Sequence, residues 1–449
     1  MPNINSFQFL ISKNNTIVKK VFIVILLLSF VKLNAAIWSV GPTQSYNNPS
    51  EVVSLVNVGD TVEIDAGVYL GDFCIWNTDE LYIKGVGGFA HLDATGVNIP
   101  NSKAIWVING DDFVIEHIEF SGAAVFDKNG AGIRMQGTNL TIRHCYFHDN
   151  ENGILAGDNQ FSDILIEHSQ FGNNGYGDGL SHNMYINHIN SFTLQYSYSH
   201  HAIVGHTVKS RAHNNYILYN RIMDENDGNS SFLVDIPNGG TSFIIGNLIH
   251  QGEHATNGNV ISYGNEGFSN PNSELYVINN TMVNNRNFCY DFLKINNNSN
   301  FVKVFNNLFI DSTCDITNYT GVIDTQTNIL TNNSGVSNLS TYDYNLISSS
   351  VAINAGSDPD SVGNFSLKPQ FEYLHTANSV QRFFSGSAMD VGAYEYISSS
   401  GVSNTIAILN NKKLLKIVDI LGKETLYKSN TPLFYLYDDG TVEKRIVIE

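Results

Sequence analysis

The middle of the chain gathers side chains that can neutralise an anion and move a proton. The chain as a whole is acidic, with 24 Lys and Arg against 42 Asp and Glu and a formal net charge of −18. Lys209, Arg211 and Arg221 therefore form a local basic cluster that differs from its surroundings. Such a cluster suits a substrate that carries carboxylates, such as a polymer of uronic acids.

Cleavage of a uronate polymer by β-elimination requires a cation that neutralises the carboxylate, a base at C5 and an acid for the leaving oxygen. Arg211 belongs to the neutralising cluster. Lys209 or His206 is the candidate base, provided that neighbouring cations favour its neutral form. Tyr185 or His182 is the candidate acid. We expect these five catalytic candidates to line one groove.

An alternation of two residues places four polar side chains on one outward line. The residue before each of them is apolar and is expected inside, at Ile133, Met184, Val208 and Val234. The outward residues are then Arg134, Tyr185, Lys209 and Asp235. We expect Arg134 and Asp235 to bind substrate at the two ends of the groove. The other candidate substrate-binding residues are His200, His201 and Arg221.

The elements that must position these residues repeat along the chain. Each copy is an apolar strand, a turn rich in Asn or Asp, and a short second strand flanked by Gly. Copies begin 23 to 33 residues apart, and their apolar spacing is two, without a helical stretch. Such periods are typical of a solenoid. The copies lie at residues 115–120, 142–147, 166–171, 194–199, 217–222, 244–249, 277–282 and 304–309.

One coil of a single-stranded right-handed parallel β-helix needs about this many residues, so the sequence predicts that all-β fold. The first residues of the copies, from Ile115 to Val304, should stack inside. Paired asparagines such as Asn279 and Asn280 should form ladders in which each amide bonds the next coil. A structural stack is expected at one repeat position, which holds His117, His144 and His168.

The cysteines and loop carboxylates of the sequence define no metal site. The spacing of the four cysteines matches no zinc motif, and three disulfide pairings are possible. Cys145 lies at an inward position and is expected to be a buried free thiol, whereas Cys289 and Cys314 are candidates for a bridge. Glu225 and Asp227 share a loop, which leaves calcium open as a cofactor. We assign no metal ligands.

The two ends of the repeat region resemble a known superfamily. Segments within residues 59–88 resemble the first coils of the pectin-lyase-like β-helix superfamily, and residues 352–356 and 390–396 resemble its closing segment. The resemblance implies one β-helix domain over residues 37–397. A Ser-rich linker is expected at residues 398–404.

The basic cluster also resembles a family motif. Residues 208–220 resemble the lysine motif of the alginate lyase and chondroitinase B family, in which a Val-Lys-Ser stretch precedes an Asn-rich coil. The resemblance implies that Lys209 is the base. Two parts of that family's machinery have no counterpart: residues 230–235 contain no arginine, and Ala202 and Val204 stand where the family has acidic calcium ligands. A polysaccharide lyase acting on a uronate polymer is the resulting expectation.

Three other activities stay open. Residues 177–182, with His206 and Arg211, are similar to mannuronan C5-epimerases, which share proton abstraction with lyases, although the Asp-Pro-His of that family is missing. A glycan-binding or adhesive β-helix would use the same groove without chemistry. A glycoside hydrolase needs two carboxylates, for which Glu225 and Asp235 are the candidate pair.

Both ends of the chain resemble export signals. Two lysines precede an apolar run at residues 21–31 and two alanines follow it, which predicts a signal peptide over residues 1–36. Residues 433–448 contain an aromatic strand, an Asp-Asp-Gly turn and an alternating strand, the pattern of a hairpin. With residues 413–424 they resemble the C-terminal sorting domain of the Bacteroidetes type IX secretion system, expected over residues 405–449.

These signals predict where the protein acts and with what. We expect a monomer that is secreted or displayed at the cell surface, with no membrane-spanning segment, because the apolar run is short for a bilayer. The expected partners are an acidic polysaccharide and the type IX secretion machinery. Nucleic acid is excluded, since its binding depends on clustered Lys and Arg that release counterions, and this chain is strongly acidic.

Overall fold

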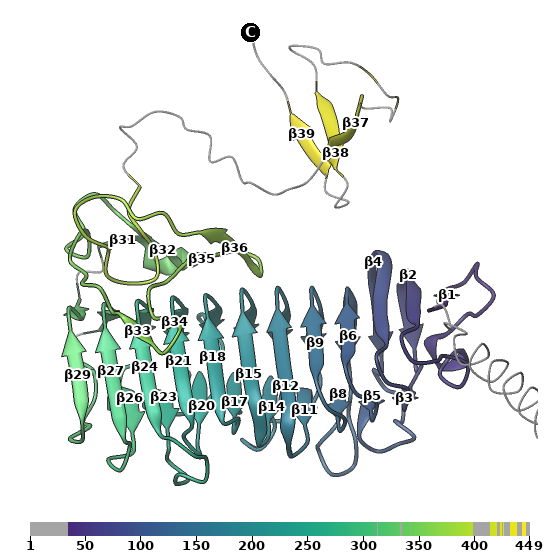
Figure 1. Cartoon of the computed structure of the whole chain (residues 1–449), viewed down its shortest axis with the longest axis horizontal. Helices are drawn as coiled ribbons and strands as arrows, with labels where there is room; N and C mark the ends of the chain where they lie inside the picture. The colour runs from purple at the N-terminus through teal and green to yellow at the C-terminus, as the bar shows by residue number, and fades with distance from the viewer. Residues whose placement is uncertain are drawn as a thin grey trace, which may run out of the picture. The chain divides into compact units, whose positions relative to one another are not determined.

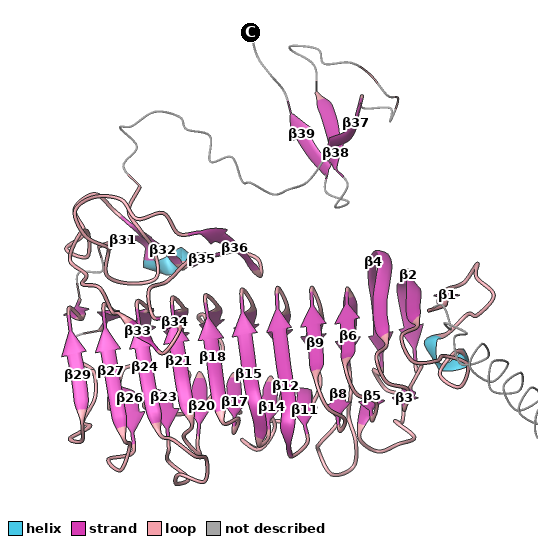
Figure 2. Cartoon of the chain, viewed as in Figure 1, coloured by secondary structure: helices cyan, strands magenta, loops and turns pink. Residues whose placement is uncertain are grey.

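The structure is a computed structural model that describes residues 35–311, 313–332 and 335–397, with parts of residues 414–445. The chain divides into two compact units between Tyr396 and Ile397. Two 3-10 helices, η1 (Pro49–Glu51) and η2 (Leu339–Thr341), are the only helices in the described residues, and the other regular elements are strands (Figure 2). No helix in this part of the chain is long and apolar enough to cross a membrane.

The first unit is a right-handed parallel β-helix built from two sheets (Figure 1). The larger sheet bends, so that most coils give it one strand before the bend and one after it. The strands at or before the bend are β1 (Ile37–Val40), β2 (Thr61–Leu70), β4 (Tyr82–Asp93), β6 (Phe113–Glu116), β9 (Leu140–Arg143), β12 (Asn159–Glu167), β15 (Ile189–Gln195), β18 (Asn214–Leu218), β21 (Thr241–Ile245), β24 (Glu274–Ile278), β27 (Phe301–Phe305) and β29 (Ile323–Gln326).

The remaining strands of each coil complete the cross-section. After the bend come β7 (Ile118–Ser121), β10 (Tyr146–His148), β13 (Gln170–Gly172), β16 (Tyr198–His200), β19 (Arg221–Met223), β22 (Leu248–Gln251), β25 (Thr281–Asn284), β28 (Leu308–Ile310) and β30 (Ile329–Thr331). The smaller sheet contains β3 (Cys74–Trp76), β5 (Ala104–Ile108), β8 (Ala131–Met135), β11 (Asn152–Ala156), β14 (Met184–Ile186), β17 (Val208–Ser210), β20 (Val234–Ile236), β23 (Asn259–Tyr263) and β26 (Asp291–Ile295).

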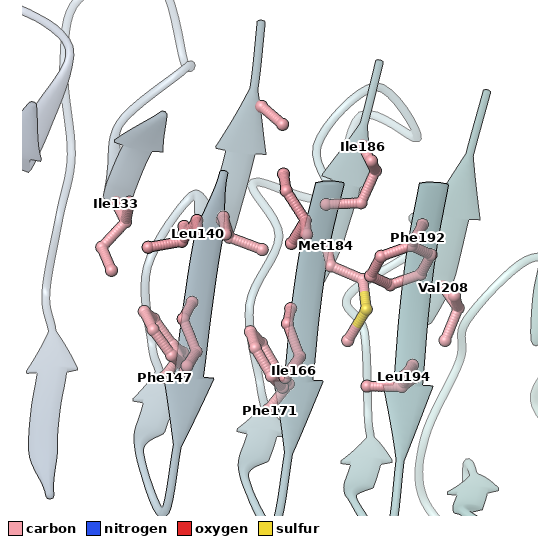
Figure 3. Packing of buried hydrophobic residues seen from close by; sticks show 14 of the residues in the cluster. Ile133, Leu140, Phe147, Ile166, Phe171, Met184, Ile186, Phe192, Leu194 and Val208 are labelled. Carbon is pink, nitrogen blue, oxygen red and sulfur yellow. The ribbon is translucent and has the colours of Figure 1, made fainter. Parts of the chain in front are cut away.

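The interior stacks equivalent residues of successive coils, as the repeat predicts. Ile115 pairs with Ile142 near one end and Val277 with Val304 near the other, and all eight predicted inward residues are fully buried. Ile133, Met184, Val208 and Val234 are likewise buried. Figure 3 shows side chains of both sheets, among them Ile166 and Val208, in this shared interior. The prediction of a β-helix is confirmed.

One residue per coil turns the larger sheet at its bend. Several of these residues, including His117, His144 and His168, have φ between 49° and 56°. The left-handed conformation is tolerated best by Asn, Asp and His among residues with a side chain. The rings of His117 and His144 are 5.0 Å apart and those of His144 and His168 are 5.1 Å apart, both stacked. The predicted structural stack is confirmed.

A ladder of buried asparagines follows the bend. The Asn220 amide donates to Asn247 Oδ1 at 3.0 Å, and the Asn247 amide donates to Asn280 Oδ1 at 2.9 Å. The Asn280 amide donates in turn to Asn307 Oδ1 at 2.9 Å. Each carboxamide also satisfies backbone groups that the bend removes from the sheet. The predicted amide ladder is confirmed.

The parallel coils end earlier than residue 397. The last parallel strand, β30, ends at Thr331, and three antiparallel hairpins follow it. They pack on the outer side of the late coils, where Leu308 lies in one buried cluster with Tyr344 and Val391. The late coils have apolar residues on their outer side, and the hairpins shield these from water. The hairpin strands are β31 (Val336–Asn338), β32 (Asp343–Leu346), β33 (Ser361–Val362), β34 (Phe365–Ser366), β35 (Phe371–Leu374) and β36 (Asn378–Gln381).

The second unit contains an antiparallel sheet of β37 (Leu414–Val418), β38 (Leu433–Tyr437) and β39 (Val442–Arg445). The pairing of β38 with β39 confirms the expected hairpin. Its turn, the linker at 398–404 and most of the expected signal peptide lie outside the described residues. The sorting function stays a prediction.

Candidate functional site

The predicted polar line exists on the outer side of the smaller sheet. Tyr185 pairs with Lys209, and Lys209 with Asp235, on the successive strands β14, β17 and β20. Arg134 belongs to the same line, but Leu155 separates it from Tyr185. Neighbouring strands lie about 4.8 Å apart, so three coils place their side chains within reach of two sugar units.

Lys209 lies between two carboxylates. Its Nζ is 3.6 Å from Asp235 Oδ2 and 3.5 Å from Glu266 Oε1, and it lies 5.6 Å from the centre of the Tyr185 ring. Only 12% of its side chain is exposed. Lys209 points outward as expected, but Glu266 and neighbouring coils cover most of its side chain.

Arg211 follows β17 and joins three partners. Its Nη2 is 2.7 Å from Glu266 Oε2, its Nε donates to Tyr185 Oη at 2.9 Å, and its Nη1 donates to Asn238 Oδ1. Partial burial acts to lower the pKa of Arg211, but the bonds to Glu266 and Tyr185 outweigh it and raise that pKa. The guanidinium is thus a fixed cation that orients the Tyr185 hydroxyl.

His182 and His206 stack at the start of the same strands. Their rings are 4.8 Å apart, and the His206 amide donates to His182 Nδ1 at 2.9 Å. The Phe232 amide donates to His206 Nδ1 at 3.2 Å, so His206 carries its proton on Nε2, which is 3.5 Å from Asp235 Oδ2. Burial, with the charges of Lys209 and Arg211, lowers the pKa of His206 to about 3.

Burial likewise lowers the pKa of His182 well below its ordinary value, so both imidazoles are neutral. In each ring Nδ1 accepts a hydrogen bond from a backbone amide. The Nε2–H group is therefore the polar group that each ring can present to the site. A base needs a free lone pair. This geometry removes His206 as a base and His182 as a charged acid, and it leaves both as hydrogen-bond donors.

Two carboxylates at the site have opposite pKa shifts. Burial raises the pKa of Asp235, against a hydrogen bond from Ser262 and the charge of Lys209. Partial burial also acts to raise the pKa of Glu266, but the hydrogen bond from Arg211 and the charge of Lys209 outweigh it and lower that pKa. Asp235 therefore accepts a proton more readily than Glu266 does.

Glu266 is the residue that the sequence analysis missed. It lies in the loop after β23, where its amide donates to Pro237 O at 2.9 Å. Gly264 turns this loop with φ of 72°. No repeat position or motif marks Glu266, and its partners lie in earlier coils, so only the folded chain shows the contact. Its side chain is 48% exposed, the most open part of the site.

Three predicted substrate-binding residues lie elsewhere. His200 and Arg221 belong to β16 and β19 of the larger sheet, on a different face from Lys209. His200 Nδ1 is 2.7 Å from His201 Nδ1, and Arg221 is 3.7 Å from Glu225. The structure places these three residues away from the column through Lys209. Whether a residue lies on the larger or the smaller sheet depends on where the turn between them falls. The spacing of residues in the sequence did not show this position.

The site does not fit calcium. A calcium ion takes six to eight oxygen ligands. Near Lys209 the carboxylates are those of Asp235 and Glu266, and both contact cations. Glu225 bonds the Tyr198 hydroxyl, and Asp227 Oδ1 is 3.0 Å from His201 Nε2, so the loop carboxylates also have protein partners. We derive no step through calcium.

A groove of about 420 Å³ crosses β6, β9, β12 and β15 on the larger sheet. Its lining includes Asp112, Asp163, Thr141 and Leu165 and contains no Lys or Arg. An acidic polymer would meet two carboxylates there without a cation. The column through Lys209 is therefore the better site for a polyanion.

Comparisons with known proteins agree with this architecture. The family model described as the right handed beta helix region matches residues 72–194, which include His182 and Tyr185 and end before Lys209. A search of curated protein sequences gave no match. Pectate lyase Pel9A superposes with a TM-score of 0.57 at 16% identity, over 82% of this chain and 98% of that chain. At this identity the likeness supports the fold alone.

Two further solved structures align less well. The A-module of an Azotobacter vinelandii mannuronan C-5 epimerase gives a TM-score of 0.32 at 15% identity, over 61% of this chain and 91% of that chain. The Dettilon tailspike protein gives 0.30 at 13% identity, over 62% of this chain and 63% of that chain. These scores carry no argument about the site.

Proposed function

We propose that this protein is a polysaccharide lyase that cleaves a uronate-containing polymer by β-elimination. One observation carries the proposal: Lys209 and Arg211 together hold the carboxylate of Glu266. Glu266 stands in for the carboxylate of a uronate. Because its side chain is the most exposed part of the site, a substrate carboxylate can replace it without disturbing the core. The likeness of the fold to a pectate lyase is consistent with this proposal.

The neutralised carboxylate is the first requirement of the reaction. The Arg211 guanidinium, which stays charged, neutralises the uronate carboxylate that replaces Glu266 and makes the C5 proton acidic. Arg211 already holds Tyr185 by donating to its oxygen at 2.9 Å. The phenolic hydrogen of Tyr185 is therefore free to reach the leaving oxygen.

The base is the Lys209 amine after it has given one proton to Asp235. Their atoms are 3.6 Å apart, and burial raises the pKa of Asp235, which favours this transfer. The amine removes the C5 proton, the C4–C5 double bond forms, and the C4–O bond breaks. Tyr185 protonates the leaving oxygen and regains its proton from solvent. Lys209 then holds the C5 proton as an ammonium, and Asp235 releases its proton to solvent, which restores the starting protonation of the site.

A second candidate is hydrolysis, favoured by the opposite pKa shifts of Asp235 and Glu266. Both contact Lys209 Nζ, so their carboxylate oxygens lie no more than about 7 Å apart. This upper limit is compatible with paired glycosidase carboxylates, which lie about 5 to 9.5 Å apart. In this pair Glu266 takes the place of Glu225, because Glu225 and Asp235 lie on different faces. Epimerisation and glycan binding alone use the same groove and stay as alternatives.

The deciding experiment incubates the purified chain with alginate, pectate and chondroitin sulfate. Elimination produces an unsaturated uronate that absorbs at about 235 nm, together with new reducing ends. New reducing ends without this absorbance indicate hydrolysis. A changed uronate composition without cleavage indicates an epimerase. Retention on a polymer-containing gel, with none of these products, indicates a binding protein.

We further propose that the protein is exported as a monomer and that its second unit is a type IX sorting domain. The support is the three-stranded antiparallel sheet of β37 to β39, in a unit separate from the β-helix. Deletion of residues 405–449 should leave the protein in the periplasm. Normal appearance of the truncated chain in the medium would contradict the assignment.

A further inference from the structure

Three side chains of consecutive coils meet on the larger sheet, away from the Lys209 column. His91 lies in β4, Glu119 in β7 and His148 in β10. His91 pairs directly with Glu119 in the strand register. His148 is offset by two residues, because it pairs with Ser121. All three side chains therefore project from the same outer surface.

Their ligand atoms converge. His148 Nε2 is 2.9 Å and His91 Nε2 is 3.9 Å from Glu119 Oε1, and one ligand atom from each residue lies within 4.8 Å of the others. Zinc binds imidazole nitrogen at about 2.0–2.1 Å and carboxylate oxygen at about 2.0–2.2 Å. Ligands on one ion are therefore separated by about 4 Å or less, which small side-chain rotations reach here.

We propose that His91, Glu119 and His148 form a Zn²⁺ site. Two imidazoles and one carboxylate are a typical set for zinc, whereas calcium and magnesium prefer oxygen ligands alone. The three side chains are between 17% and 21% exposed, so an ion can enter and keep a water molecule as its fourth ligand. The site joins three coils that no disulfide connects.

A second carboxylate orients one of the ligands. Asp149 Oδ2 is 2.6 Å from His148 Nδ1, which fixes the proton on Nδ1 and leaves the Nε2 lone pair for a ligand. Glu119 Oε1 lies 2.9 Å from His148 Nε2, so a metal ion can replace the proton that these two atoms would otherwise share. The Tyr146 ring, 4.3 Å from the imidazole, holds its plane.

The three stacked surface histidines at the bend do not share this arrangement. The rings of His117, His144 and His168 are stacked face to face. Ring nitrogens of parallel imidazoles direct their lone pairs along parallel planes, so these do not converge on one point. His117 is therefore a matched control: it is a surface histidine with a carboxylate neighbour, Glu116, at 3.4 Å.

The test titrates the tag-free, chelator-treated full chain with Zn²⁺ alone and measures heat and bound metal. We expect one equivalent of Zn²⁺ per chain and a melting temperature that rises by a few degrees. Ca²⁺ should give neither effect. His148→Gln and Glu119→Gln should weaken Zn²⁺ binding by about 100-fold or more, and Asp149→Asn by about 10- to 100-fold. His117→Asn, which tolerates the left-handed backbone, should bind as the wild type does.

Two results would overturn the proposal. One is wild-type protein that retains no Zn²⁺ after gel filtration. The other is equal Zn²⁺ affinity in wild type and in His148→Gln, which would place the ion elsewhere on the surface. Circular dichroism of each variant shows whether it is folded, and the wild-type titration decides the question even where a variant is not.

Discussion

Arg211 holds the carboxylate of Glu266, with Nη2 2.7 Å from Oε2. The contact joins a strand end of one coil to a loop two coils later. It pairs the cation of the site with an acidic group of the same chain. A site whose cations already bind a carboxylate is suited to a substrate that brings its own.

Removing the charge of Glu266 should therefore strengthen substrate binding. Glu266→Gln keeps the size of the side chain but no longer competes with the uronate carboxylate for Lys209 and Arg211. We expect KM for the cleaved polymer to fall about 3- to 10-fold, as the loss of one partly exposed ion pair implies. Initial rates over a range of polymer concentrations measure it.

Glu253→Gln is the matched control, because Glu253 is exposed and its hydrogen bond is to Asn287 rather than to the site. Its KM should equal that of the wild type. An unchanged or higher KM in Glu266→Gln would show that Glu266 is not a stand-in for the substrate.

The amide ladder should be a main source of stability. Asn247 Oδ1 accepts two hydrogen bonds from Asn220, one from its backbone N–H at 2.9 Å and one from its side-chain amide at 3.0 Å. Asn247→Ala leaves these buried donors without partners, at about 1–3 kcal/mol each. We expect the free energy of unfolding to fall by about 3–5 kcal/mol in urea denaturation. Asn190→Ala removes an exposed amide and should cost less than about 1 kcal/mol. Equal losses would contradict the ladder.

Much of the fold was predictable because a β-helix demands the same residue type at the same place in each coil. Ile115 and its equivalents, and the line from Tyr185 to Asp235, followed from a repeat and an alternation of two. The packing of the hairpins over Leu308 could not be predicted in this way. A sequence does not show which outward apolar residue is shielded from water by another segment. Glu266 had no repeat position. That His200 lies on the larger sheet, away from Lys209, also could not be predicted, because the position of the turn after it decides the sheet.

His206 gives a pH dependence whose sign is fixed. Burial holds its folded-state pKa at about 3, below the ordinary value of 6.5. Between these values only the unfolded chain binds the proton, so stability falls as pH falls from 6.5 towards 3. The free energy of unfolding of the wild type, minus that of His206→Gln, should therefore fall by about 1.4 kcal/mol per pH unit in this window.

Above about pH 7.5 the two profiles should run parallel, since His206 is then neutral in both states. Urea denaturation at a series of pH values gives both curves. Parallel curves down to about pH 4 would mean that native His206 is protonated, and the tautomer argued from the Phe232 amide would fail.

Thiol reactivity should follow burial. Cys74 and Cys145 are buried and free, and Cys289 is bonded to Cys314. Burial raises the pKa of Cys145 to about 12 and that of Cys74 well above its ordinary value, so neither forms a thiolate readily. The native chain should not react with a thiol reagent. Denaturation without a reductant should make the two free thiols reactive. Denaturation with a reductant should make all four cysteines reactive. Four thiols without a reductant would exclude the disulfide.

The variant Tyr185→Phe tests the proposed general acid without changing the other groups of the site. It removes only the hydroxyl that Arg211 orients, while the ring beside Lys209 stays. We expect kcat to fall by about 10²- to 10⁴-fold, the usual effect of losing a general acid, with little change in KM. Steady-state rates test this. A variant with wild-type kcat would remove Tyr185 as the acid.

The most direct test of elimination at this site is the initial rate of absorbance increase at about 235 nm for wild type and Lys209→Gln. Gln keeps a polar side chain of similar length beside Asp235, which limits the loss of stability. With a uronate polymer, the wild type should give a steady rise and the folded variant none. A flat trace from the wild type on every uronate polymer, or an equal rate from Lys209→Gln, would contradict the account.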